Sequence, residues 1–256
     1  MPSPPLTARS HVEFFHLVFL RALVARGEDK GLFVLKGGCN LRFFFGSVRY
    51  SEDIDLDVTV VAKGTLKNKV QRLLASPTVT APLRSQALEL VDITAPKQTD
   101  ATQRWKVGLR SPSVPVPLRT KIEFSRRGPA PGAVFEAVDT EILRRYGLST
   151  FPATHYDLAS AIVQKVEALA GRSTPQARDV FDLNHLGAKL AAGAPSLGLD
   201  PKTRSRAIEH AMGISFDEYA AQVVSYLDPE QRELFEGRDA WNTMQSAVVS
   251  RLEALR

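Results

Sequence analysis

The stretch from residue 36 to residue 57 constrains the fold more than any other part of the chain. It places two glycines directly after a short apolar run, then a segment of helical character, and then the run Asp-Ile-Asp-Leu-Asp. Successive side chains of a strand point to opposite faces, so the three aspartates would share one face while Ile54 and Leu56 enter the core. The stretch therefore predicts a strand, a helix and a second strand that carries a row of carboxylates.

The same stretch predicts a site that handles phosphate. Gly37 and Gly38 leave bare backbone N–H groups at a helix N-terminus, which favours an anion. The like charges of Asp53 and Asp55 repel each other unless a cation compensates them. Mg²⁺, with Mn²⁺ as a second candidate, suits such a pair because it takes oxygen ligands and is commonly shared with substrate phosphates. For either motif alone, a plain turn or a solvated acidic edge remains the alternative.

The composition is that of an ordinary globular protein. The 256 residues are 44% hydrophobic, and a single cysteine excludes an internal disulfide. No signal sequence is apparent at the start, and the apolar runs are far shorter than a membrane span. We therefore expect a cytoplasmic protein without a membrane segment.

Charge is distributed unevenly along the chain. The net charge is +5, but residues 1–150 hold 22 Lys and Arg against 14 Asp and Glu (+8), while residues 151–256 hold 11 against 14 (−3). Between Lys97 and Arg127 there are eight basic residues and only two acidic ones. A basic face beside a phosphate site can attract a polyanion such as RNA, and a solvated sheet face is the alternative.

Periodicity divides the chain into two parts. Strand patterns dominate up to about residue 126, with helical segments around them, and after residue 129 the pattern becomes helical. Residues 76–82 look like a loop, and the prolines of residues 111–117 are expected to break any continuous pairing. We expect an α+β (α/β) chain with a core domain over residues 1–150 and a helical domain over residues 151–256.

Two segments carry a resemblance to a known family. These are Leu35-Lys-Gly-Gly-Cys-Asn-Leu-Arg42 and Ser51-Glu-Asp-Ile-Asp-Leu56. Together they resemble the nucleotidyltransferase superfamily and, more narrowly, the AbiEii/AbiGii toxin family, which includes the MenT-type toxins. The resemblance implies a mixed β-sheet core with flanking helices and a C-terminal helical domain. It also implies nucleotide-binding roles for Gly37, Gly38, Arg42 and Ser51.

Glu123 is the candidate for a third carboxylate. A polymerase-type site needs such a group on a neighbouring strand to hold metal or to take a proton. Glu123 is the acidic residue of a basic strand, Arg119-Thr-Lys-Ile-Glu-Phe-Ser125, and the resemblance also places the third acid here. Asp92 is the weaker candidate.

The helical half adds two residues through the resemblance. Lys165 and the later run Arg178-Asp-Val-Phe-Asp-Leu183 are similar to motifs in which a Lys contacts triphosphate and an Asp completes the site. Lys165 and Asp179 match these positions, with Arg178 and Asp182 as weaker matches. From the residues alone, two packed helices joined by a salt bridge would explain the same pattern.

The resemblance finally implies an activity and its partners. It implies an Mg²⁺-dependent toxin that transfers nucleotides from an NTP to the 3′ end of tRNA and so blocks translation. A cognate antitoxin would be encoded nearby. Two alternatives stay open, which are transfer to a small molecule or protein side chain, and a non-catalytic domain that binds RNA or a partner. Cys39 departs from the family, where Ser or Thr often follows the glycines, so a hydroxyl role at this position is lost.

Overall fold

The structure, a computed structural model, contains two compact units. It describes residues 7–59, 61–190 and 197–255. The first unit holds the described residues up to 44 together with residues 50–156, and the second holds residues 45–49 and 157–255. The chain thus passes from the first unit to the second after Tyr156, whereas the sequence placed this boundary near residue 150.

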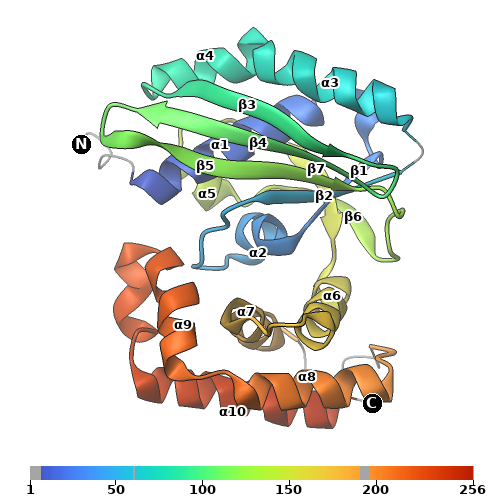
Figure 1. Ribbon diagram of the computed structural model, residues 1–256, viewed down its shortest axis with the longest axis vertical. Coiled ribbons are helices and arrows are strands. Elements are labelled where there is room, and N and C mark those ends of the chain that lie inside the picture. Colours follow the sequence, from blue (N-terminus) through green and yellow to red (C-terminus); the bar gives the residue numbers. More distant parts are fainter. Residues whose placement is uncertain (1–6, 60, 191–196, 256) are drawn as a thin grey trace. The chain divides into compact units, whose positions relative to one another are not determined.

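A seven-stranded mixed sheet forms the centre of the first unit (Figure 1). In sheet order its strands are β3 (Glu89–Gln98), β4 (Thr102–Ser111), β5 (Val114–Ser125), β2 (Ile54–Val58), β1 (Phe33–Lys36), β7 (Pro152–Tyr156) and β6 (Ala133–Ala137). Strand β2 pairs antiparallel with β1 and parallel with β5. The expected mixed sheet with flanking helices is therefore confirmed, and its acidic strand lies inside the sheet.

Helices flank this sheet. They are α1 (Ala8–Leu23), α2 (Gly37–Phe45), α3 (Lys63–Ala75), α4 (Pro77–Ser85) and α5 (Thr140–Arg145), with a 3-10 turn at Gly27–Asp29. Figure 1 shows α3 and α4 running along the sheet beside β3. Thr7 caps the N-terminus of helix α1, because its side chain accepts a hydrogen bond from the Ser10 N–H, and the helix buries Phe15 and Phe19 in the core.

Residues 76–82 do not form the expected loop. Helix α4 covers most of them, with Pro77 in its first turn, where a missing N–H costs no helical hydrogen bond. Val79 and Leu83, one turn apart, are buried. The many Pro, Thr and Ser residues hid this apolar spacing.

The prolines of residues 111–117 interrupt the regular pairing of β4 with β5, as expected, but the strand continues past them. Strand β5 begins at Val114 and runs through Pro115 and Pro117. A register irregularity opposite β4 accommodates them, and the pairing of β5 with β2 lies at its other end, from Ile122 to Ser125.

Strands also occur beyond residue 126, which the periodicity did not predict. Strand β6 and strand β7 pair with each other, and β7 pairs parallel with β1 through Leu35 and His155. Four of the five residues of β7 are buried and four of the five residues of β6 are exposed, so neither strand shows the alternation of a half-buried strand. The predicted change from strands to helices therefore comes later in the chain.

Helices make up most of the second unit. They are α6 (Leu158–Gly171), α7 (Ala177–Gly187), α8 (Pro201–Gly213), α9 (Phe216–Gln222) and α10 (Arg238–Ala254). Two 3-10 turns, Val224–Tyr226 and Pro229–Leu234, lie between α9 and α10. Residues 45–49 join this unit through a bridge between Arg49 and Leu227.

In the described part of the chain, none of the helices combines the length and the apolar character that a membrane crossing requires.

Candidate active site

The turn between β1 and α2 brings backbone very close to a carboxylate. Gly37 has φ +67°, and a Cβ placed on it would lie 2.9 Å from Oδ2 of Asp55. Lys36, the last residue of β1, is the register partner of Asp55. Only glycine combines this backbone conformation with this lack of space. The helix N-terminus at Gly37 and Gly38 therefore begins beside the acidic strand, as the sequence predicted.

The three aspartates of the acidic run have different surroundings. Ile54 and Leu56 are fully buried, in agreement with the predicted alternation. Asp55 lies in register with Glu123 on the neighbouring parallel strand β5. Equivalent positions on parallel neighbours share a face, so the two carboxylates lie side by side on the sheet.

Asp57 is the buried member of the run. Its Oδ1 accepts a hydrogen bond from Nζ of Lys36 at 2.5 Å, and its Oδ2 accepts one from the hydroxyl of Tyr156 at 2.6 Å. The Tyr156 hydroxyl in turn accepts from the N–H of Ala130. Burial and the hydrogen bond to Asp57 raise the pKa of Tyr156, which keeps the hydroxyl protonated as a donor. Asp57 thus ties β2 to β1 and β7.

Two basic residues form ion pairs with the carboxylates of Asp53 and Glu123. Lys121 donates to Asp53 twice, from its backbone N–H at 3.0 Å and from Nζ at 2.7 Å. Nε of Arg104 donates to Glu123 at 2.6 Å. The side chains of Asp53 and Glu123 remain 28% and 30% exposed, so solutes can reach both.

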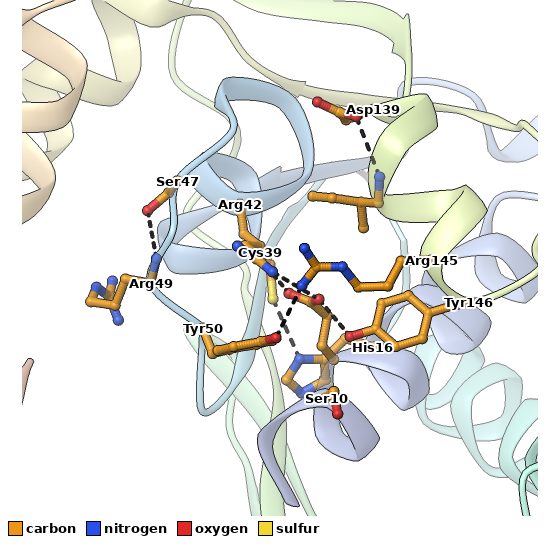
Figure 2. Close-up of polar contacts among 12 residues, drawn as sticks. Ser10, His16, Cys39, Arg42, Ser47, Arg49, Tyr50, Asp139, Arg145 and Tyr146 are labelled. Atoms are coloured by element: carbon orange, nitrogen blue, oxygen red, sulfur yellow. Dashed lines mark hydrogen bonds and ion pairs between the residues drawn. The ribbon is translucent and has the colours of Figure 1, made fainter. Parts of the chain in front are cut away.

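Ser51 and Cys39 hold the start of the acidic strand. The Ser51 hydroxyl and the Cys39 thiol both donate to the backbone carbonyl of Asp53, at 2.8 Å and 3.3 Å. Cys39 is buried against His16, which Figure 2 shows, and burial raises the pKa of its thiol, so the sulfur stays protonated. Burial lowers the pKa of His16 to about 3, so the ring is neutral. Ser51 therefore contacts backbone in this structure.

Arg42 forms a buried ion pair. Its Nε donates to Glu13 at 2.6 Å, and its guanidinium lies over the Tyr50 ring at 4.4 Å (Figure 2). The Tyr146 hydroxyl donates to the same carboxylate, and Arg145 donates to the Tyr50 hydroxyl. In the structure Arg42 therefore binds Glu13, whereas the sequence resemblance predicted that Arg42 contacts the nucleotide.

Lys165 and Asp179 contact each other in the second unit. Nζ of Lys165 donates to Oδ1 of Asp179 at 3.0 Å and forms an ion pair with Asp182 at 2.6 Å. Arg49 clamps Asp182 with two hydrogen bonds of 3.0 and 2.8 Å, and Arg172 donates to Asp179. Both aspartates are fully buried.

The ionisation of this network follows from its charges. Burial opposes the charge on Asp182, but Arg49 and Lys165 outweigh it and lower the pKa of Asp182 to about 2. Burial likewise opposes the charge on Lys165, but Asp182 and Asp179 raise its pKa. Lys165 and Asp182 are therefore both charged at neutral pH. The interhelical salt bridge that we considered as the alternative does form, and it is buried.

A family model now adds to this geometry. The model described as "Nucleotidyl transferase AbiEii toxin, Type IV TA system" matches residues 18–254. This chain belongs to the AbiEii family of nucleotidyltransferase toxins. The match confirms the resemblance that the glycine turn and the acidic strand carried. An AbiEii toxin belongs to a toxin–antitoxin pair, so the family also implies a cognate antitoxin.

Solved structures support the AbiEii fold. The crystal structure of JHP933 from Helicobacter pylori matches with a TM-score of 0.57 and 20% identity, over 98% of this chain and 96% of that one. A second H. pylori protein, suggested to be a nucleotidyltransferase, matches with a TM-score of 0.59 and 20% identity, over 98% and 99%. At this identity the likeness concerns the fold. No curated protein matches the sequence.

The donor set of this AbiEii chain fits a hard divalent cation. Asp53, Asp55 and Glu123 offer carboxylate oxygens, the ligands that Mg²⁺ prefers. Within the described ranges, no three His, Cys, Asp or Glu side chains are gathered closely enough to hold an ion. A metal ion would compete with Lys121 and Arg104 for the same oxygens. The carboxylates fit in chemistry and accessibility, and binding would rearrange their ion pairs.

Several contact partners of the predicted residues in each unit were not anticipated. Lys36, Arg104 and Lys121 were visible as basic residues, but no spacing rule pairs them with particular aspartates. Arg49 lies 133 positions before Asp182, so local patterns carry no sign of their pairing. The basic character of the strand around Glu123 was the one usable signal.

Proposed function

We propose that this AbiEii protein is an Mg²⁺-dependent nucleotidyltransferase that adds nucleotides from an NTP to the 3′ end of tRNA and thereby blocks translation. The observation that carries the catalytic part is the register of Asp55 with Glu123, beside the turn at Gly37. It joins an anion-binding helix N-terminus to a row of accessible carboxylates. The tRNA acceptor rests on the sequence resemblance and on the basic strands.

The candidate site residues of the first unit have distinct roles in this reaction. Backbone N–H groups at Gly37 and Gly38 bind the β and γ phosphates. Asp53, Asp55 and Glu123 would hold Mg²⁺, which when bound neutralises phosphate charge and polarises the reacting phosphoryl group. Their ion pairs with Lys121 and Arg104 keep two of these side chains oriented before substrate arrives.

The reaction is a displacement at the α-phosphorus. The oxygen of the RNA 3′-hydroxyl forms a bond to that phosphorus, and the bond to the bridging oxygen breaks. Pyrophosphate leaves with the electron pair of that bond. The hydroxyl proton passes to the Glu123 carboxylate, which acts as general base. The roles of Lys165 and Asp179 rest on the family resemblance. Lys165 neutralises charge on the triphosphate, and Asp179 accepts a hydrogen bond from Nζ of Lys165.

A transfer assay tests this proposal. Purified protein is incubated with Mg²⁺, each labelled NTP in turn, and total tRNA, and label on RNA is measured. Asp55→Asn removes one charge from the carboxylate row while keeping the size of the side chain. We expect a loss of transfer on the order of 100-fold or more, as when a group that stabilises transition-state charge is removed. Asp100→Asn, a strongly exposed position paired with Lys63, is the matched control and should retain activity.

The acceptor decides between the proposal and its alternatives. Label on a small molecule or on protein, with none on RNA, would contradict the tRNA assignment and keep the enzyme class. Equal arrest of growth by the wild type and by Asp53→Ala would contradict catalysis as the basis of toxicity.

A further inference from the structure

The outward face of β3, β4 and β5 carries a strip of basic side chains that ends at the carboxylates. We call Lys97, Arg104, Lys106 and Lys121 the basic strip. Register places Lys97 opposite Arg104, and Arg104 opposite Glu123, which is itself beside Asp55. One row of the sheet therefore passes from Lys97 on the edge strand to the proposed metal ligands on β2.

A second row runs parallel to the first. Lys106 on β4 is the register partner of Lys121 on β5, whose ammonium reaches Asp53. The core-facing neighbours Trp105 and Val107 are buried, so Lys106 points outward from the sheet, and it is exposed. Two rows of cations thus lead to the carboxylates from the same side.

The strip holds more positive charge than its own acids compensate. Arg104 and Lys121 are paired with Glu123 and Asp53, but no acidic residue of the described chain forms an ion pair with Lys97 or Lys106. Like charges directly across a strand pair destabilise the sheet, as at Lys106 and Lys121.

The far end of this face is balanced. Arg110 pairs with Glu89, and Arg119 pairs with Asp92. The excess of positive charge is therefore confined to the end of the face that adjoins the proposed site, where an anionic ligand would remove the repulsion.

We propose that the basic strip binds the phosphates of the RNA strand whose 3′ end reacts, with Lys97 and Lys106 as its uncommitted contacts. The inference rests on the proposed function, because it takes the carboxylates as the point where the strand ends. An RNA strand suits two rows of cations better than a nucleotide does, since a polyanion presents successive phosphates. Phosphate contacts of this kind position a strand without reading its sequence.

Binding measured as a function of salt tests the strip. The probe is a single-stranded RNA oligonucleotide, and the protein carries Asp55→Asn so that no transfer occurs. Adding Lys97→Gln and Lys106→Gln should lower the slope of log K against log salt by about 1.4, since each phosphate contact to a single strand contributes about 0.7. If the two proteins bind equally at 1 M salt, where electrostatic attraction is screened, the double variant should bind RNA on the order of tenfold more weakly at about 0.15 M salt.

Two further variants separate charge from other effects. Lys67→Gln with Lys202→Gln changes the net charge equally at exposed helix positions and should leave the slope nearly unchanged. Lys97→Arg with Lys106→Arg keeps the charge and should bind like the wild type. Equal slopes for the strip pair and the helix pair would overturn the proposal. The proposal would also be overturned if polyglutamate bound more tightly than RNA and lost affinity in the strip variants. That result would indicate that the face binds an acidic protein.

The outcome is distinct from that of the proposed function. RNA binding through the strip without any transfer to RNA would refute the proposed function and support the strip. Transfer and binding that are both unaffected by the strip variants would refute the strip alone.

Discussion

Gly37 illustrates why one residue type is required at a single position. A side chain here meets two obstacles, a left-handed backbone with φ +67° and an Asp55 oxygen 2.9 Å from the position of a Cβ. The first obstacle exists at any glycine with positive φ. The second exists because the turn approaches a carboxylate, and it connects the glycine motif to the acidic motif that follows it.

Substituting Gly37 by alanine should therefore damage the site more than the fold. Gly147→Ala is the matched control, since Gly147 has φ +63° and no atom within 4 Å of its added Cβ. Both variants should lose about 1–3 kcal/mol of stability from backbone strain. Only Gly37→Ala should also lose transfer activity, on the order of 100-fold, because it displaces Asp55. Activity measured on protein confirmed as folded by circular dichroism checks this, and equal losses in the two variants would contradict it.

Asp57 and Asp55 should separate stability from activity. Asp57 is buried and accepts hydrogen bonds from Lys36 and Tyr156, so Asp57→Asn should lower the free energy of unfolding by about 2 kcal/mol. Its activity per folded molecule should remain close to that of the wild type. Asp55→Asn should leave the free energy of unfolding close to that of the wild type and should lose transfer activity. Urea denaturation together with the transfer assay measures both, and loss of activity in folded Asp57→Asn would instead place this residue in the site.

At the scale of elements, ion pairs join α6 to α7, and the sequence patterns of the two helices predicted only part of this network. Lys165 on α6 contacts Asp179 and Asp182 on α7, and Arg49 completes the group from a segment far away in the chain. Burying ions is costly unless each charge is paired. Removing one partner therefore leaves an uncompensated charge behind.

Arg49→Met should destabilise the protein by on the order of 3–5 kcal/mol at neutral pH. Arg206→Met, at an exposed position of α8, is the control and should change stability little. The effect depends on pH, because the pKa of Asp182 is about 2 in the folded protein and near 3.8 as an ordinary value. Its depressed pKa contributes stability above about pH 4 that is lost as the pH falls toward 2. The difference between wild type and Arg49→Met in urea denaturation should thus narrow from pH 5 to pH 2, and a constant difference would contradict this account.

Elements with a local pattern were predicted well, and those without one were missed. Helix α3 is one with a clear local pattern, because Leu66, Val70 and Leu74 recur at helical spacing and are all buried. Strand β7 was missed because four of its five residues are buried and so do not alternate, and it forms through its pairing with β1 and β6.

At the scale of the whole molecule, the sequence by itself determined the order of the parts. The apolar run, the glycine turn and the alternating aspartates are local patterns, so they predicted a strand, a helix and an acidic strand, and they carried the family. The excess of basic residues in the first 150 was equally visible. Each of these properties depends on residues that are close in the chain.

Only the tertiary structure decided which groups meet. Strand order brought Glu123 beside Asp55 and aligned Lys97 and Arg104 with them, and the course of residues 45–49 brought Arg49 to Asp182. A buried charge needs one particular partner, and so does each residue of a paired strand, but these partners lie tens to more than a hundred residues apart in the chain. Alternation shows which face a side chain takes, and only the packing of distant segments decides what that face contacts.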